Sequence, residues 1–389
     1  MQINRIPTAK ILILALIFLA SMTSCHDRTG KGELAINFEN RKLAPPNDSH
    51  SLGDFTIDEP ISQGNLQVFL IHGKEGLGEK TYTTLSSALQ NKKVTVKETG
   101  DVNQLSISNY GNAHVFIHTG DIVKGGKQDR TIAQDVIIPP GAKNVPLESF
   151  CVEQGRWQQR EGEEVARFES TENMLSSRKL KMAARYDKNQ GQVWQNIAEE
   201  QSKLGEKVSI INGYSVAMND EISKTSLQLT LESKELKKAK SKLDEKFASL
   251  VENKETAIGY AYAINGEIYG IDVYNNKKLF DELWGKIAES IIVESVSNLE
   301  EKKAKAANKS DVTVFMNAVN TKDRKKSVQV INEATVLEIL ENEKENVVFS
   351  TIDKDENNWI HTNYMKKNNQ QNGSKESGIN FLDQRRNQN

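Results

Sequence analysis

The sequence predicts an α+β fold, in which an antiparallel β-sandwich or partly open barrel precedes a helical segment, a β-hairpin and a closing helix. Three observations predict it. Between residues 62 and 152, short runs alternate apolar and polar side chains, as at 66–70, which is the period of a half-buried strand. After Trp157 the apolar residues fall at helical spacing. Asn265-Gly266 then separates two β-type runs, as in a two-residue type I′ hairpin.

The β-rich part shows the same alternation at residues 94–96, 105–107 and 115–117. Glycine and asparagine cluster between these runs, and Pro139-Pro140-Gly141 indicates a turn. One short helix is expected to interrupt the strands at residues 83–90. Many short strands at this spacing favour a sandwich or a barrel.

The helical part contains apolar residues every seven positions, at Ile222, Leu229, Leu236, Leu243 and Leu250. The partner positions three residues later are mostly charged, whereas a dimeric coiled coil needs them apolar. An amphipathic helix that packs on its own domain is therefore favoured over a zipper.

The hairpin is expected over residues 257–264 and 267–274, followed by a helix with its apolar side at residues 280–291. The Lys/Glu/Ala-rich residues 298–310 indicate a solvated helix or a linker. Apolar runs at 312–315, 328–330 and 347–349 predict a small β-containing region. We thus expect a main domain at 62–297, an appended region at 298–364 and a disordered tail at 365–389.

The first 24 residues resemble a lipoprotein signal peptide. Arg5 and Lys10 precede an apolar run at 11–20 that is too short to span a bilayer. Met22-Thr23-Ser24-Cys25 resembles a bacterial lipobox, which implies cleavage before Cys25 and lipid attachment to its thiol. The alternative is an ordinary secretory signal with a chance cysteine. Residues 25–61, polar and irregular, are expected to be the lipidated cysteine and a flexible tether.

The predicted location is the bacterial cell envelope, with the chain lipid-anchored to a membrane and facing the periplasm or the exterior. The membrane, through Cys25, is thus one expected partner. The formal net charge of −2 gives no electrostatic basis for binding nucleic acid. The sequence does not define an oligomeric state.

The only cysteine besides Cys25 lies in the segment Ser149-Phe150-Cys151-Val152-Glu153-Gln154-Gly155-Arg156-Trp157. A strand over 146–153 would place Cys151 near its last buried layer and Glu153, Arg156 and Trp157 at its opening. Because no histidine lies nearby in sequence to make a thiolate, Cys151 is interpreted as a packed residue rather than a nucleophile.

A second polar segment is Gly125-Gly126-Lys127-Gln128-Asp129-Arg130. Two adjacent glycines let backbone N–H groups approach a ligand, and Lys127 and Arg130 suit an anion such as phosphate or carboxylate. The spacing is not that of a Walker A loop. The alternative is a charged turn after a strand.

A third polar segment contains Gln190-Gly191. It could present a helix N-terminus to a ligand or simply begin a helix.

His114 and His118 could suggest a metal site, but on one strand they would lie about 13 Å apart at about 3.3 Å per residue. A weak site remains conceivable if His118 and Asp121 converge across a turn. We expect no metal and no cofactor.

One family has motifs that resemble, in the same order and spacing, four segments of this chain: 125–130, Ile138-Pro139-Pro140-Gly141, 149–157 and Gln190-Gly191-Gln192-Val193-Trp194. It is the bacterial and archaeal domain family named for association with ADP-ribosylglycohydrolase and rhodanese-phosphatase superfamily proteins. The hairpin at 263–274 also fits, and the resemblance covers roughly residues 64–295. It implies no established activity, only genomic company with NAD and ADP-ribose metabolism.

The resemblance supports a shared ligand-binding pocket, whose members are Lys127, Gln128, Arg130, Glu153, Arg156 and Trp157. In the leading hypothesis, an envelope lipoprotein binds a polar or anionic ligand there. An alternative is a hydrolytic enzyme, possibly acting on ADP-ribose- or NAD-derived substrates, with Glu153 as the candidate catalytic base. A third is a scaffold lipoprotein whose charges form internal salt bridges. A raised Glu153 pKa would favour its role as a catalytic base, and a lowered Glu153 pKa would favour an internal ion pair.

Overall fold

The computed structural model describes residues 55–76, 80–160, 167–218, 223–301, 304–343 and 346–367, which all belong to the compact unit Pro46–Asn389. The predicted signal peptide, Cys25, most of the predicted tether and nearly all of the predicted tail lie outside the described residues. Within them, no helix is both long and apolar enough to cross a membrane.

The largest sheet has nine strands, and its pairings are all antiparallel. Its order is β1 (Thr56–Ile57), β3 (Leu66–His72), β13 (Ala257–Ile264), β14 (Glu267–Tyr274), β18 (Asn358–Lys366), β17 (Asn346–Asp353), β16 (Thr335–Glu341) and β15 (Lys325–Val330), with β2 (Ile61–Gln63) paired to β3. The region that the sequence predicts as a C-terminal appendage therefore supplies β15–β18 of this sheet.

The predicted hairpin is confirmed. Asn265 and Gly266 link β13 to β14 with φ angles of 50° and 77°, and positive values at both central positions are what a type I′ turn requires.

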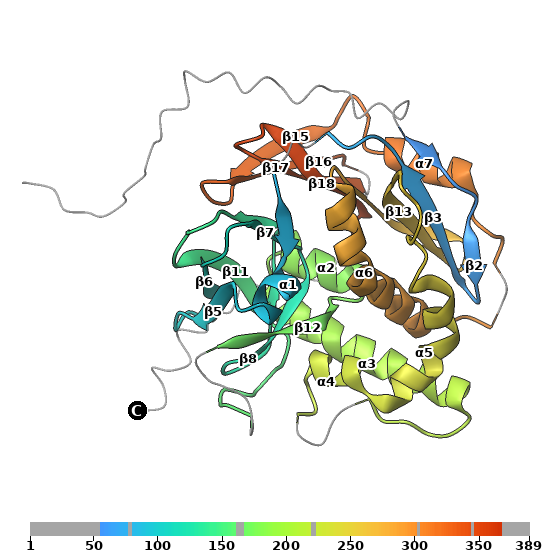
Figure 1. Ribbon diagram of the computed structural model, residues 1–389. Coiled ribbons are helices and arrows are strands. Elements are labelled where there is room, and N and C mark those ends of the chain that lie inside the picture. Colours follow the sequence, from blue (N-terminus) through green and yellow to red (C-terminus); the bar gives the residue numbers. More distant parts are fainter. Residues whose placement is uncertain are drawn as a thin grey trace, which may run out of the picture. The chain divides into compact units, whose positions relative to one another are not determined.

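Helices cover both faces of the nine-stranded sheet (Figure 1). On β3, Leu66, Val68 and Leu70 pack with α6 (Lys277–Ser297). Phe69 and Ile71 point to the other face, into the core that contains α7 (Lys309–Asn317). Since successive strand side chains point to opposite faces, burial on both faces explains why β3 is apolar almost throughout.

The prediction of a strand at 312–315 is wrong, because this segment lies within α7. Asn308 caps the helix and, with Asp311, forms a capping box, which satisfies otherwise unpaired N–H groups of its first turn. Val312, Phe315 and Met316 then face the sheet. The β-forming preference of residues 312–315 is therefore weaker than the combined effect of the N-terminal cap and the helical spacing of the apolar residues. The runs at 328–330 and 347–349 do lie in strands.

Two smaller sheets form the β-rich part and share a core. One has the order β10 (Val136–Ile138), β7 (His114–Ile117) and β4 (Tyr82–Thr84). The other is a curled antiparallel sheet with the order β12 (Phe168–Met174), β8 (Asp121–Gly125), β9 (Arg130–Ile132), β11 (Val145–Cys151), β6 (Gln104–Asn109) and β5 (Val94–Glu98). The predicted α+β class with a partly open barrel is thus confirmed. The helix expected at 83–90 begins two residues later, as α1 (Leu85–Gln90), because Thr84 caps it.

The helical segment consists of α2 (Arg178–Arg185), α3 (Gln190–Asn212), α4 (Leu227–Glu232) and α5 (Lys234–Phe247), which pack on α6 and on the end of β11. The heptad leucines do not lie on one helix. Ser233 has extended backbone angles of −62° and 143°, and its side chain accepts a hydrogen bond from the Leu236 amide. Ser233 therefore ends α4 and caps α5. Of the predicted heptad positions, Leu236 is buried in the core of this segment and Leu243 packs against it, together with Leu227 and Leu231 of α4. This is consistent with a segment that packs on its own domain, as two helices rather than one.

The contact between β13 and β14 leaves no room for a side chain at Gly259. A Cβ there would lie 2.4 Å from the Asp272 carbonyl oxygen and 2.9 Å from the Val273 Cα. We expect Gly259→Ala to lower the free energy of unfolding by about 1–3 kcal/mol, because backbone must move. Urea unfolding followed by circular dichroism measures this.

The control is Gly285→Ala in α6, where a Cβ would meet no atom within 4 Å. That substitution should raise the free energy of unfolding by about 0.5–1 kcal/mol, since alanine favours helix. Equal unfolding midpoints for the two variants would contradict the packing described for Gly259.

Candidate functional site

The two polar segments singled out in the sequence lie side by side in the structure. The 125–130 turn joins β8 to β9, and the 152–160 loop follows β11. Because β9 pairs with β11, with Cys151 opposite Arg130, both segments leave the same end of the curled sheet. The structure thus brings together all six predicted ligand-binding residues, although with different roles.

A cluster of four buried charges connects the two segments. Arg160 donates to Asp129 at 2.6 Å and to Glu153 at 2.9 Å. Arg156 donates through Nε to the same Glu153 oxygen at 2.6 Å and lies 3.5 Å from Asp129. Neither carboxylate side chain is exposed, and the guanidinium side chains are 9% or less exposed. Two acids and two bases balance in charge, so we call these four residues the ion quartet.

The ion quartet also reaches the helical segment. Ser226, the N-cap of α4, accepts a hydrogen bond from Arg160 at 3.1 Å, and its hydroxyl lies 3.4 Å from Asp129. On the β side, the Gly125 amide donates to Asp129 at 3.0 Å. The quartet therefore fixes the turn, the loop and the start of α4 relative to one another.

Glu153 does not lie at an opening, as the sequence predicts, but is fully buried. Burial raises its pKa, but hydrogen bonds from Ser223 and Arg156 and the charge of Arg160 outweigh burial, so its pKa lies below the ordinary value. Asp129 shows the opposite balance: burial exceeds the effect of Arg160, and its pKa is raised. A lowered Glu153 pKa favours an ion pair over a general base.

Lys127, Arg130 and Trp157 form a second group. The Lys127 Nζ and the Arg130 Cζ lie 5.6 and 5.7 Å from the centre of the Trp157 ring, within the range of cation–π contacts. Arg130 is fully buried, and its Nη2 lies 3.6 Å from Glu98. Trp157 is 40% exposed, which leaves part of the ring facing solvent.

Gln128 supports Arg130 from within the turn. It is buried, and both its carbonyl oxygen and its Oε1 accept hydrogen bonds from the Arg130 Nη1 at 3.3 Å. The Gln128 side chain thus helps to position the Arg130 guanidinium.

Cys151 is a packed residue at the end of β11. It is fully buried, and burial, the largest effect on the thiol, raises its pKa to about 11. The side-chain amide of Gln190, the first residue of α3, bonds both its amide and its carbonyl, at 2.8 and 2.9 Å. Gln190-Gly191 accordingly begins a helix, capped by Asn189, and ties that helix to β11.

A hollow of about 470 Å³ opens beside the ion quartet. It lies between the 152–160 loop and the start of α4, and its described lining residues are all polar: Gln154, Arg156, Gln158, Gln159, Arg160, Ser223, Lys224 and Thr225. Of the six predicted residues, only Arg156 lines it. These lining residues include Arg156 and Arg160, which belong to the charge-balanced quartet, as well as Lys224, and they include no carboxylate. The hollow therefore offers hydrogen-bond donors to a polar or anionic ligand.

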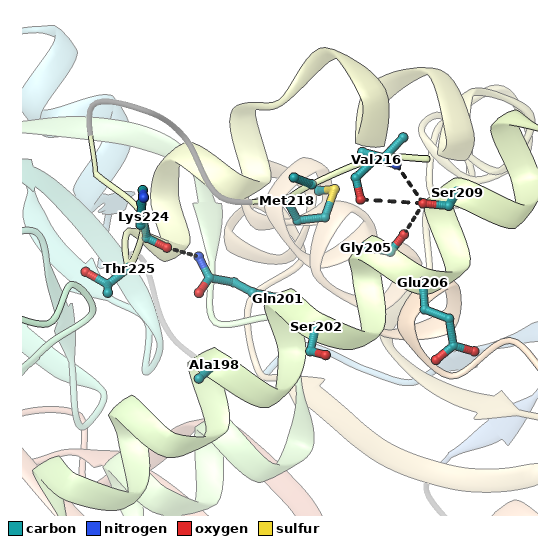
Figure 2. Close-up of a pocket in the computed structure, with 11 residues that line it drawn as sticks. Ala198, Gln201, Ser202, Gly205, Glu206, Ser209, Val216, Met218, Lys224 and Thr225 are labelled. Carbon is teal, nitrogen blue, oxygen red and sulfur yellow. Dashed lines mark hydrogen bonds between the residues drawn. The ribbon is translucent and has the colours of Figure 1, made fainter. Parts of the chain in front are cut away.

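A second hollow, of about 580 Å³, runs along α3 and shares Lys224 and Thr225 with the first. Figure 2 shows Gln201 of α3 directed toward Lys224 and Ser209 directed toward Val216. The Gln201 amide donates to the Lys224 carbonyl at 3.3 Å. The 224–225 segment is therefore the wall between two neighbouring hollows.

A buried polar network, which the sequence patterns did not predict, lies in the core between the sheets. His361 on β18 contacts Asp135 through Nδ1 at 2.8 Å and Asp272 on β14 through Nε2 at 2.9 Å. Arg185 donates to Asp135 at 3.2 Å. Asp272 is 5% exposed, Asp135 is 1% exposed and His361 is fully buried.

The pKa directions show how this network is charged. Burial lowers the pKa of His361, but the charge and hydrogen bond of Asp135, together with Asp272, raise it overall. Burial alone would raise the pKa of Asp272, yet the His361 contact lowers it to about 2. Asp135 likewise has a pKa well below its usual range, because Arg185 and His361 outweigh burial.

His118 joins this network from the end of β7 rather than pairing with His114. Its Nδ1 lies 2.7 Å from the Thr119 carbonyl and its Nε2 lies 2.8 Å from the Tyr274 hydroxyl. Asp121 does converge with it, but by accepting a hydrogen bond from the His118 backbone amide at 3.0 Å. Among the described residues, His118, Asp272 and His361 offer ligand atoms that all lie within 4.8 Å of one another.

The sequence carried one signal for this network. Asp272 and Tyr274 on β14, and His361 and Asn363 on β18, are polar residues at alternate positions, and the two pairs are opposite each other. Their alternation indicates a shared face, but it resembles that of a solvent-exposed strand. Only the pairing of strands nearly ninety positions apart showed this face to be internal.

Glu153→Gln should lower the free energy of unfolding by about 3–5 kcal/mol, because it leaves two buried guanidinium groups short of a counter-charge. Guanidinium chloride unfolding measures this. As a control, Glu148→Gln removes the half-exposed ion pair with Lys188, which should change stability by less than about 1 kcal/mol. A Glu153→Gln protein as stable as the control would show that the quartet does not hold the loop.

The comparisons with known proteins gave one match. No curated protein and no solved structure matched the chain significantly. A family model described as ARPP-1, the ARG and Rhodanese-Phosphatase-superfamily-associated Protein domain, matches residues 54–365. The match extends well beyond the 64–295 span of the sequence resemblance, and it takes in β15–β18, which complete the nine-stranded sheet. The chain therefore belongs to the ARG and Rhodanese-Phosphatase-superfamily-associated Protein domain family.

Proposed function

We propose that this protein is an envelope lipoprotein whose domain binds a polar, anionic ligand in the hollow beside the ion quartet. The observation that carries the proposal is the lining of that hollow. Its described residues comprise three cations, three amides and two hydroxyl side chains, which supply hydrogen-bond donors for phosphate, carboxylate or sugar hydroxyl groups.

The ion quartet prepares two of these cations for binding. Glu153 and Asp129 hold the Arg156 and Arg160 guanidinium groups in place from the protein side. A ligand that meets cations already positioned loses less conformational entropy than one that must order them. Lys224, which is exposed, adds a cation at the rim, where it also borders the second hollow.

In this site the predicted residues have other roles than those expected from the sequence. Arg156 contacts the ligand, and Glu153 orients Arg156. Lys127 and Trp157 form a neighbouring surface, supported by Gln128 and Arg130. The hydrolase alternative has less support, because a carboxylate held by two guanidinium groups with a lowered pKa is a weak base.

The binding proposal predicts the effect of reversing the charge of Lys224. Thermal shifts of the full chain would be measured with inorganic phosphate, glucose 6-phosphate and ADP-ribose, with glucose as the uncharged probe. We expect at least one anion to raise the melting temperature of the wild type. Lys224→Glu should lower the affinity for that anion tenfold or more, since a hydrogen bond to a charged group contributes about 1.5–3 kcal/mol.

The control is Lys322→Glu, which makes the same charge change at another exposed position. It should leave both the melting temperature and the anion affinity near wild-type values. Binding is contradicted if none of the anions shifts the wild type, or if both variants respond alike.

The envelope location is supported by the leader pattern, which ends in Met22-Thr23-Ser24-Cys25. A diacylglyceryl group on Cys25, joined by N-acylation, supplies the two or more chains that stable membrane anchoring requires. The polar residues that follow would separate the domain from the bilayer.

Cys25→Ser should therefore abolish incorporation of a labelled fatty acid and move the protein from the membrane to the soluble fraction. Metabolic labelling with an alkynyl fatty acid and detergent phase partitioning measure these two effects. Cys151→Ser serves as the control, because Cys151 is buried and should not be acylated. Unchanged labelling of the Cys25→Ser protein would exclude this anchor.

A further inference from the structure

The strongest cluster outside the proposed ligand site is formed by His118, Asp272 and His361. The three residues follow or belong to three different strands, β7, β14 and β18. Asp272 and His361 are diagonal neighbours on paired strands, since Asp272 is opposite Asn363 and Tyr274 is opposite His361. Strand pairing therefore fixes two of the donors, and the third comes from the facing sheet.

The outer partners of these side chains orient their inner atoms toward one another. The His118 Nδ1 donates to the Thr119 carbonyl at 2.7 Å, which leaves Nε2 as the atom with a lone pair. The His361 Nδ1 is directed at the Asp135 carboxylate at 2.8 Å, so that its Nε2 also points inward. Such carbonyl and carboxylate partners orient metal-bound histidines in proteins.

Asp272 is held in the same manner. Its Oδ2 accepts a hydrogen bond from the Tyr260 hydroxyl at 2.6 Å, and its Oδ1 accepts one from Asn363 at 2.8 Å. The Oδ1 atom lies 2.9 Å from the Nε2 of His361. Two imidazole nitrogens and one carboxylate oxygen thus meet within 4.8 Å.

We propose that His118, His361 and Asp272 bind one divalent transition metal of the zinc class, a site beyond the proposed ligand function and independent of it. Two imidazoles and a carboxylate are a common donor set for zinc and related ions, whereas calcium and magnesium prefer oxygen ligands alone. The Tyr274 hydroxyl, 2.8 Å from the His118 Nε2, is the nearest candidate for a fourth ligand.

Metal binding replaces a proton on His361 with the metal ion. Without metal, the Nε2 of His361 carries a proton that it donates to Asp272. On binding, the His361 proton leaves to solvent, and the hydrogen bonds from His361 to Asp272 and from the Tyr274 hydroxyl to the His118 Nε2 break. The two nitrogen lone pairs and the Asp272 carboxylate then coordinate the metal. Because all three ligands are buried, the ion would join the two sheets as a structural element. This inference departs from the expectation of no metal drawn from the sequence.

The test uses the full chain, dialysed against EDTA and then titrated with ZnCl2. We expect one equivalent of zinc per chain by inductively coupled plasma mass spectrometry, together with a higher melting temperature than that of the EDTA-treated protein. Cobalt(II) should also bind and give a visible absorption band that zinc displaces.

Matched variants locate the site. His118→Gln should lose the bound zinc, whereas His114→Gln, four residues earlier on the same chain segment, should keep one equivalent. Asp135→Asn, which alters the group behind His361, should weaken zinc affinity about 10- to 100-fold while the ligands stay in place. Circular dichroism would check that each variant folds.

The wild-type measurement decides the matter even if a variant fails to fold. If the wild type takes up no zinc and no cobalt at micromolar free metal, the proposal is overturned. Equal zinc content in the His118→Gln and His114→Gln proteins would also overturn it. The anion experiments above are unaffected by either outcome.

Discussion

The contact of His361 with Asp135 and Asp272 is the interaction on which the arrangement of this domain depends. It joins β18, near the end of the described chain, to β14 and to the residue before β10. Burying charged groups is unfavourable unless each meets an opposite charge with hydrogen bonds. Asp135 meets both Arg185 and His361, so the two sheets and α2 must meet in this one arrangement to satisfy all of these groups.

The ion quartet solves the same problem at the edge of the domain. Asp129 comes from a turn, Glu153, Arg156 and Arg160 come from a loop, and Ser226 comes from a helix cap. Loops of this kind bury few apolar side chains, so charge pairing replaces apolar packing as their restraint. The same pairing places Arg156 and Arg160 in the lining of the neighbouring hollow, so the side chains that restrain the loop are also those of the proposed ligand site.

Membership of the family gives the fold a context but not a reaction. The chemistry has to be inferred from the sites, and the two sites differ in kind. The hollow beside the quartet is lined by polar side chains, whereas the histidine cluster is buried, with the Tyr274 ring stacked 4.4 Å from that of His361. The two proposals concern different parts of the domain and are compatible with each other.

The sequence by itself determined the α+β class and the type I′ hairpin at Asn265-Gly266, because turn chemistry and local periodicity are properties of neighbouring residues. The grouping of the 125–130 and 149–157 segments rested on family resemblance and not on a local pattern. Tertiary structure alone decided that Glu153 is buried between two arginines and that β15–β18 extend the main sheet. It also created the histidine cluster, since His118 and His361 meet only after distant strands pair. Burial and charge pairing are long-range quantities, and one residue's neighbours along the chain do not specify them.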